Sequence, residues 1–93
     1  MHIALLQVKL HIPACHSLKE KRSLIKRLIS LVRARHNIAV AEIGDHDAWQ
    51  SARLGLVTIN NESGHTDRVL QRVIGEIGRF DGCELLDYQI ERF

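Results

Sequence analysis

Two short segments of the sequence hold histidine, aspartate and cysteine residues close together, and such side chains can take part in metal binding or catalysis. His16 directly follows Cys15, and His46 lies between Asp45 and Asp47. Imidazole, carboxylate and thiolate groups bind metal ions and can transfer protons. HxxxH, CxxC and HExxH spacings are absent from the sequence, and Asp is common in turns for backbone reasons. A metal or small-molecule site therefore stays open as an alternative, while we predict no catalytic residues, no cofactor and no enzyme activity.

The cations of residues 19–35 are the second group suited to binding. Residues 1–40 hold eight basic residues and one acid, whereas residues 41–93 hold five basic and ten acidic residues. Such segregation favours a polyanion, because lysine and arginine can neutralise phosphates without reading a base sequence. A solvated helix face balanced by acids elsewhere is the simpler alternative. The residues predicted to bind RNA are Lys19, Lys21, Arg22, Lys26 and Arg27, with His16 and Ser17 at the helix entrance.

The elements that position these residues follow from the spacing of apolar side chains. Alternation over residues 2–12 predicts a half-buried strand that Pro13 ends. Ser17 and Glu20 form a capping box for a helix over residues 18–35. Lys21, Arg22 and Lys26 are expected to avoid its apolar stripe, so that charge reversal there would leave folding intact. Further strands are predicted at 38–43, 50–59 and 83–93. A second helix follows the loop at 60–64, and its apolar stripe is Val69, Leu70, Val73, Ile74 and Ile77.

This order of elements predicts an α+β ferredoxin-like plait, β-α-β-β-α-β, in one domain over residues 1–93. Right-handed crossovers place the first and third strands centrally in a four-stranded antiparallel sheet, with both helices on one face. Three loops should then meet at one end of the sheet. Those loops carry Cys15, His16, Asp45, His46, Asp47, Asp81 and Cys83.

Several segments of the sequence resemble the YlxP-like family of small bacterial proteins. They are residues 11–22 (HIPACHSLKEKR), 41–42 (AE), 49–52 (WQSA) and 85–88 (LLDY). The resemblance implies a ferredoxin-like fold without agreed catalytic residues. Members of that family are often encoded beside translation factors and ribosome-binding factor A, which implies a ribosome-associated role. We therefore expect a non-enzymatic accessory domain that binds ribosomal RNA or a ribosome-associated assembly.

Other interpretations stay open beside this one. The basic helix could meet an acidic protein, or the chain could form a homodimer through the open sheet face or a strand edge. Gly55 marks a bulge or a close backbone approach, which leaves open whether Leu56 or Val57 joins Ile3 and Leu5 on that face.

Single residues of the later segments add three expectations. Trp49 is expected to pack in the core rather than to serve as an exposed recognition residue. Leu86, Tyr88 and Ile90 should share one face of the last strand. Aromatic side chains are missing from the central strands, so stacking of bases on the sheet is not expected.

The ends and composition of the sequence predict a compartment. The N-terminus shows no signal-peptide pattern, and no apolar run approaches the roughly 20 residues that span a bilayer. The two cysteines form no framework of closely spaced pairs. We therefore expect a cytoplasmic protein with reduced thiols and no membrane partner.

Overall fold

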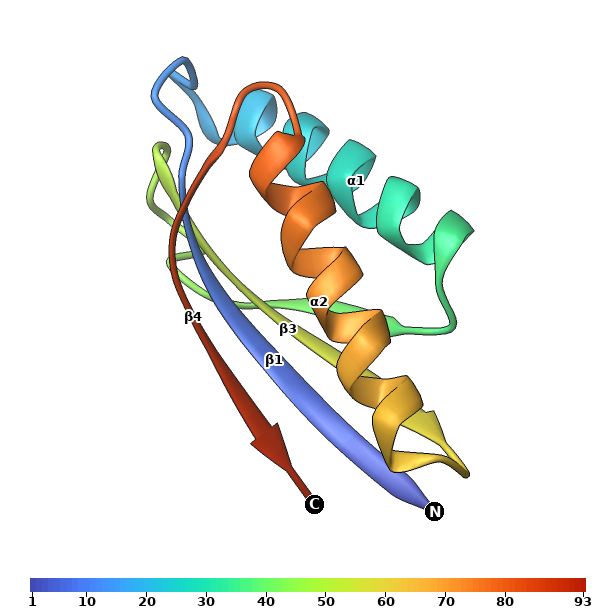
Figure 1. Cartoon of the computed structure of the whole chain (residues 1–93). Coiled ribbons are helices and arrows are strands. Elements are labelled where there is room, and N and C mark those ends of the chain that lie inside the picture. The colour runs from blue at the N-terminus through green and yellow to red at the C-terminus, as the bar shows by residue number, and fades with distance from the viewer.

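The computed structural model describes all 93 residues apart from the side chain of Ser63. The predicted β-α-β-β-α-β order is confirmed (Figure 1). The first helix has the predicted bounds, and the strand ends differ from prediction by one residue or so. The elements are β1 (His2–His11), α1 (Leu18–Arg35), β2 (Ala39–Gly44), β3 (Ser51–Asn60), α2 (Ser63–Arg79) and β4 (Glu84–Arg92).

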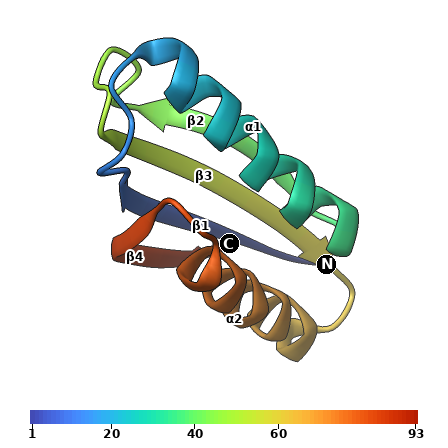
Figure 2. The same ribbon diagram turned by 90° about the horizontal axis from the view of Figure 1, so that it is seen from above.

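The four strands form one antiparallel sheet in the order β2-β3-β1-β4, so β1 and β3 are central as predicted. β1 pairs with β3 without interruption from His2 opposite Asn60 to His11 opposite Ser51. Both helices lie on the same side of the sheet, α1 over the β2 and β3 half and α2 beside β1 and β4 (Figure 2). The other side of the sheet is left open. The ferredoxin-like architecture is therefore confirmed.

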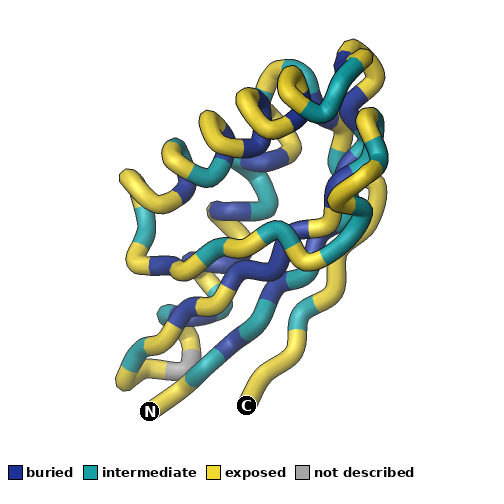
Figure 3. The backbone as a smooth tube through the Cα atoms, turned by 180° about the vertical axis from the view of Figure 1, so that it is seen from behind, coloured by how far each residue is buried: buried dark blue, intermediate teal, exposed yellow. Residues whose placement is uncertain are grey.

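The core lies between the helices and the sheet. Alternate residues of β1, such as Leu6 and Leu10, are fully buried, and Leu28 of α1 and Leu70 of α2 pack over the sheet at the same depth. Exposed and buried segments alternate along both helices in Figure 3, as expected for amphipathic helices that cover one layer. Among the described residues, no helix is both long enough and apolar enough to cross a membrane.

The capping box at the start of α1 is confirmed, with one difference in its partner. Ser17 Oγ accepts a hydrogen bond from the backbone N–H of Glu20 at 3.1 Å. Glu20 Oε2 accepts in turn from the backbone N–H of His16 at 2.8 Å, one residue before the cap. Both side chains thus satisfy backbone donors at the helix entrance and fix where α1 begins.

The register around Gly55 settles the composition of the open face. Pairing between β1 and β3 has no bulge at Gly55, so Val57 lies opposite Leu5 on the open face and Leu56 is buried. Gly55 instead allows a close approach: an added Cβ would lie 3.1 Å from Cγ2 of Ile43 on β2. The register shift of this half of the sheet falls in β2, between Glu42 and Gly44.

A second register shift changes the expected face of β4. Tyr88 and Ile90 lie opposite Val8 and Leu6, which face the helices, in accord with the prediction. The pairing then shifts between Lys9 and Leu10, so that Leu85 rather than Leu86 lies opposite Leu10. Leu86 keeps 54% of its surface exposed. The prediction that Leu86 shares the face of Tyr88 and Ile90 is therefore wrong, because a bulge adds one residue to this strand.

The three loops predicted to meet at one end of the sheet do so (Figure 1). The side chain of Gln50 joins two of them, since its Nε2 donates to the carbonyl oxygens of Pro13 at 3.2 Å and Cys15 at 3.1 Å. The backbone carbonyl of Gln50 also accepts from the N–H of Ile12. These contacts hold the β2–β3 loop against the segment that leads into α1.

The turn before β4 offers a stability test with an internal control. Gly82 has φ +100°, and an added Cβ would lie 2.8 Å from Cδ1 of Leu24. We expect Gly82→Ala to lower the free energy of unfolding by about 1–3 kcal/mol. Gly78→Ala, in α2 with open space around the added methyl, should raise it by up to about 1 kcal/mol. Urea unfolding of both variants checks this, and equal effects would contradict the assigned turn.

Candidate functional site

The outward face of α1 carries most of the cations that the sequence predicted to bind a polyanion. Leu24, Ile25 and Leu28 turn toward the core, and the helical repeat turns the residues between them to solvent. Among the described residues, no side-chain ion pair or hydrogen bond reaches the exposed cations of this face. These cations, the α1 cation row, are Lys19, Arg22, Lys26, Arg27 and Arg33.

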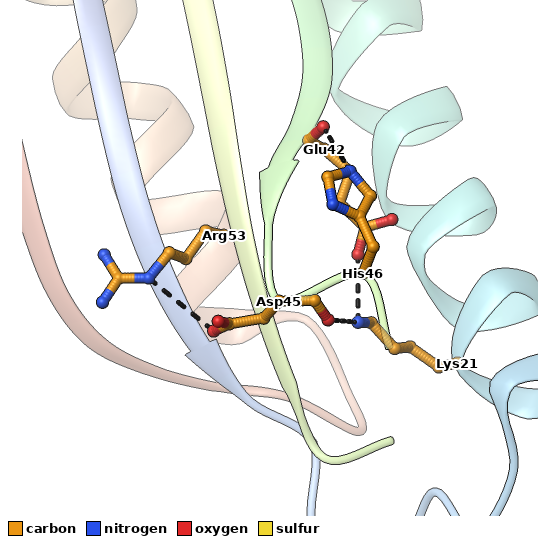
Figure 4. Close-up of polar contacts among 5 residues, drawn as sticks. All are labelled: Lys21, Glu42, Asp45, His46 and Arg53. Atoms are coloured by element: carbon orange, nitrogen blue, oxygen red, sulfur yellow. Dashed lines mark hydrogen bonds and ion pairs between the residues drawn. The ribbon is translucent and has the colours of Figure 1, made fainter. Parts of the chain in front are cut away.

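Lys21 does not belong to this row, and the prediction that it avoids the buried face of α1 is wrong. Its side chain is 2% exposed. Its Nζ lies 3.1 Å from Oε2 of Glu42 on β2 and donates a hydrogen bond to the backbone carbonyl of Asp45 (Figure 4). Charge reversal at Lys21 is therefore expected to destabilise the fold rather than to leave it intact, because it would bury a second carboxylate beside Glu42.

The sequence did hold a signal for the burial of Lys21. Lys21 precedes Leu24, Ile25 and Leu28 by three, four and seven residues, which is the spacing of one helix face. A lysine at such a position can reach through its long stem to an acidic group on another element. Only the partner, Glu42, lay beyond what the helix pattern alone could name.

The β2–β3 turn is built to receive the Lys21 ammonium group. Asp45 adopts a left-handed conformation with φ 59°, which orients its carbonyl oxygen toward Nζ of Lys21. The Asp45 carboxylate lies 3.7 Å from Nε of Arg53, and Nε2 of His46 donates to the carbonyl oxygen of Glu42 at 3.1 Å. Glu42 Oε2 receives no hydrogen bond of good geometry among the described residues, so the Lys21 charge is what balances it.

The loop end does not assemble its chemistry-bearing residues into a metal site. Among the described residues, no group of three His, Cys, Asp or Glu side chains lies close enough to hold an ion. Burial, followed by the Glu20 carboxylate, raises the pKa of the Cys15 thiol, and burial raises the pKa of Cys83. Raised thiol pKa values disfavour the reactive thiolate. We therefore propose neither a metal site nor a cysteine nucleophile here.

The other predicted residues of the helix entrance have separate roles. The Ser17 hydroxyl is engaged in the helix cap, while His16 is exposed and donates its backbone N–H to Glu20. His16 therefore stays available to a ligand through its ring. Ser17 acts by fixing the start of α1 rather than by reaching outward.

Trp49 is exposed, so the prediction that it packs in the core is wrong. It keeps 52% of its surface exposed, and it lines a shallow depression together with His16 and Gln50. Trp49 lies in the loop before β3, next to Gln50, whose side chain bonds to the segment that leads into α1. An exposed indole near the entrance of α1 is a surface on which a flat apolar group can stack.

Two grooves flank the α1 cation row. One of about 340 Å³ lies between α1 and β2. It is lined by Ile25 and Ile29, by the cations Arg22, Lys26 and Arg33, and by Glu42 of β2. The second, of about 410 Å³, is lined by Lys19 and Arg27 beside Leu24 and Cys15. Apolar side chains therefore flank the α1 cation row on both sides, and its cations are spread along the helix.

Comparison with known proteins assigns the chain to a family. The family model described as "Protein of unknown function (DUF503)" matches residues 3–90. The chain belongs to the DUF503 family. A relative from Bacillus subtilis (strain 168), "Uncharacterized protein YlxP", is 37% identical over 68 residues, which cover 73% of this chain and 74% of the relative. The predicted resemblance to the YlxP-like family is thereby confirmed.

Solved structures agree with the fold of this DUF503 member. The designed protein Foldit4 matches with a TM-score of 0.55 at 14% identity, covering 98% of this chain and 96% of its own. A candidate antibiotic biosynthesis monooxygenase from Deinococcus radiodurans matches with a TM-score of 0.53, also at 14% identity, covering 100% of this chain and 90% of its own. At such identities the likeness concerns the fold alone.

The Lys21–Glu42 pair predicts a loss of stability that an exposed lysine would not give. We expect Lys21→Met to lower the free energy of unfolding by about 2–4 kcal/mol, because Glu42 loses its counter-charge in a largely buried setting. Adding Glu42→Gln should recover a large part of that loss. Urea unfolding of the two single variants and the double variant measures the coupling. Additive losses, or a Lys21→Met effect below about 0.5 kcal/mol, would contradict the pairing.

Proposed function

We propose that this DUF503 member is a non-enzymatic accessory domain that binds RNA through the outward face of α1. The α1 cation row contacts the phosphate backbone, and ribosomal RNA or a ribosome-associated assembly is the expected partner. The proposal follows the family resemblance for the kind of RNA, and follows the charge and geometry of α1 for the surface.

The observation that carries the proposal is the density of exposed cations without a carboxylate partner on α1. Among the described residues, α2 also has three such cations, Arg68, Arg72 and Arg79, but it carries Asp67 and Glu76 as well. The α1 cation row has five, Glu20 is the only acid of the helix, and Arg22 and Lys26 stand four residues apart. Like charges at that spacing cost about 0.2–0.5 kcal/mol in an isolated helix. A polyanion would relieve this repulsion, and phosphates supply the matching charge.

The sheet offers little to nucleic-acid bases, which favours the helix as the contact. The open faces of β1 and β3 present residues such as Leu5, Gln7, Gly55 and Val57, with no aromatic side chain on either strand. Domains that read RNA on their sheet stack bases on aromatic residues of the central strands. Phosphate contacts from α1 do not require such residues.

The groove between α1 and β2 favours a second candidate, an acidic protein partner. Ile25 and Ile29 give this groove apolar lining that phosphates do not need, and its three cations, against the single acid Glu42, would suit an acidic peptide. Nuclease treatment separates the two partners. Association that survives nuclease would favour the protein, and association that nuclease abolishes would favour RNA.

The α1 cation row can be tested by charge reversal against a matched control. We expect the triple variant Arg22→Glu, Lys26→Glu and Arg27→Glu to lose cosedimentation with ribosomes while staying folded, because these side chains are exposed. In titrations with ribosomal RNA, its log–log salt slope should fall by about three, one for each cation that no longer neutralises a phosphate.

The control reverses three exposed arginines of α2, Arg68, Arg72 and Arg79, and changes the net charge by the same amount. This control should keep most of the salt slope. Equal losses in the two triple variants would mean that overall charge, and not α1, governs binding. Absence of wild-type binding to ribosomes and to RNA would reject the proposal.

Trp49 should contribute through stacking and not through charge. We expect Trp49→Ala to weaken binding to RNA with unpaired bases by about 1–3 kcal/mol, the usual contribution of one stacked base, and to leave the salt slope unchanged. Trp49→Phe should keep most of the affinity. Fluorescence anisotropy with a loop-containing RNA and a fully paired RNA checks this. An equal loss on both RNAs would contradict stacking at Trp49.

A further inference from the structure

We propose that the open face of the sheet is the interface of a two-fold homodimer, independently of whether α1 binds RNA. This face lies on the side of the sheet away from both helices (Figure 2). The two surfaces are therefore separate, and a second copy on the sheet does not compete with a ligand on α1.

One half of the open face is apolar and exposed. Leu5 of β1 lies opposite Val57 of β3, and Ile3 lies opposite Ile59. Val57 is 39% exposed, Ile59 46%, and Ile43 of β2 48%. Exposed apolar side chains on adjacent strands form a continuous patch, which in soluble proteins commonly marks a contact surface.

The patch contains both a hollow and the side chains that could fill it. A depression of about 240 Å³ is lined by Leu5, Ile43 and Val57 around the small residues Gly55 and Ala41. Because Gly55 has no side chain, the surface of the sheet is recessed at this position, beside the side chain of Ile43. In a two-fold pair, protruding residues of each copy meet the hollow of the other, so a single surface supplies both parts.

Charge indicates a second copy as the occupant of this face. Its polar half pairs Lys9 with Arg53 on one side and with Asp87 on the other. Glu91, opposite Leu5, and Glu84, opposite His11, add two carboxylates on β4, so this face carries Lys9 and Arg53 beside three acids. A strongly acidic or strongly basic partner would match only one sign of charge. An identical face carries both signs, so the cations of each copy can meet acids of the other.

The available area is sufficient for a specific dimer. Strands of six to ten residues, at about 3.3 Å per residue and about 4.8 Å between strands, give the face about 550 Å² in projection. Two copies would bury about 1,100 Å² in total, just above the roughly 1,000 Å² expected of a specific interface. We therefore expect a dimer that dissociates measurably on dilution.

Light scattering and sedimentation equilibrium between about 1 and 100 μM test the proposal. The wild type should approach twice its 10.6 kDa mass at the upper concentrations. Val57→Lys should raise the dimer dissociation constant by about 100-fold or more, because it places an unpaired charge in the interface. Leu5→Glu should act in the same way, and Val57→Lys keeps the test decisive if Leu5→Glu fails to fold.

The matched control is Tyr88→Lys, which changes a residue of similar exposure, 45%, on the helix side of β4. It should leave the dissociation constant within a few-fold of the wild type, with circular dichroism confirming that all variants fold. A monomeric wild type at 100 μM would overturn the proposal. A dimer that Val57→Lys does not weaken would also overturn it, and would place the contact at a strand edge or on the helices.

Discussion

The ammonium group of Lys21 lies where three elements meet. It extends from the first turn of α1, contacts the carboxylate of Glu42 on β2 and donates to the backbone of the turn that leads into β3. A charge in this position is stable only if its partners stay in place, because an unpaired buried charge is far costlier than an exposed one. The pair therefore ties the helix to the β2 edge and, together with the buried stripe of Leu24, Ile25 and Leu28, fixes the orientation of α1. With Lys21 held inward, the neighbouring cations must face outward.

This arrangement separates two kinds of basic residue on one helix. Lys21 contributes to stability and is closed to ligands, while Arg22 next to it is exposed and free of ion pairs among the described residues. A count of lysines and arginines cannot make that distinction. The same separation recurs at the far end of α1, where Arg35 and His36 both contact Glu76 of α2. The cations between these two anchored ends are the ones left for a partner.

Much of the fold could be predicted from the sequence because its signals were local. Ser17 and Glu20 marked the start of α1, and alternation defined β1, so the order of elements followed from rules of connection. Predictions failed where the outcome depended on contacts between distant segments. Trp49 lies next to Gln50, whose side chain bonds to the distant Pro13, and the place of Leu86 depended on the register shift between Lys9 and Leu10. Neither contact leaves a mark in the spacing of nearby residues.

The same distinction between local signals and contacts of distant segments applies to the candidate site. Exposure of Lys19, Lys26 and Arg27 could be predicted from the helical repeat alone. That repeat places Lys21 on the buried face of α1, whereas lysine side chains usually stay in solvent. Only the position of Glu42 on β2, which the helix pattern does not give, decides between burial and exposure. A single carboxylate on another element thus gives Lys21 a structural role, although lysine is a residue type that is usually exposed.

Because both helices lie on one side of the sheet, the proposed dimer would present two separate α1 surfaces to a ligand. Two copies joined through their open faces turn their α1 helices to opposite outer sides of the assembly. With the proposed function, two such helices would hold two separate segments of one folded RNA and not a single short stretch of phosphates. Once the first segment is held, the second meets its site at a high effective concentration. A small domain with modest affinity on each side would then act as a bridge, and the strength of its binding would depend on the distance between the two segments.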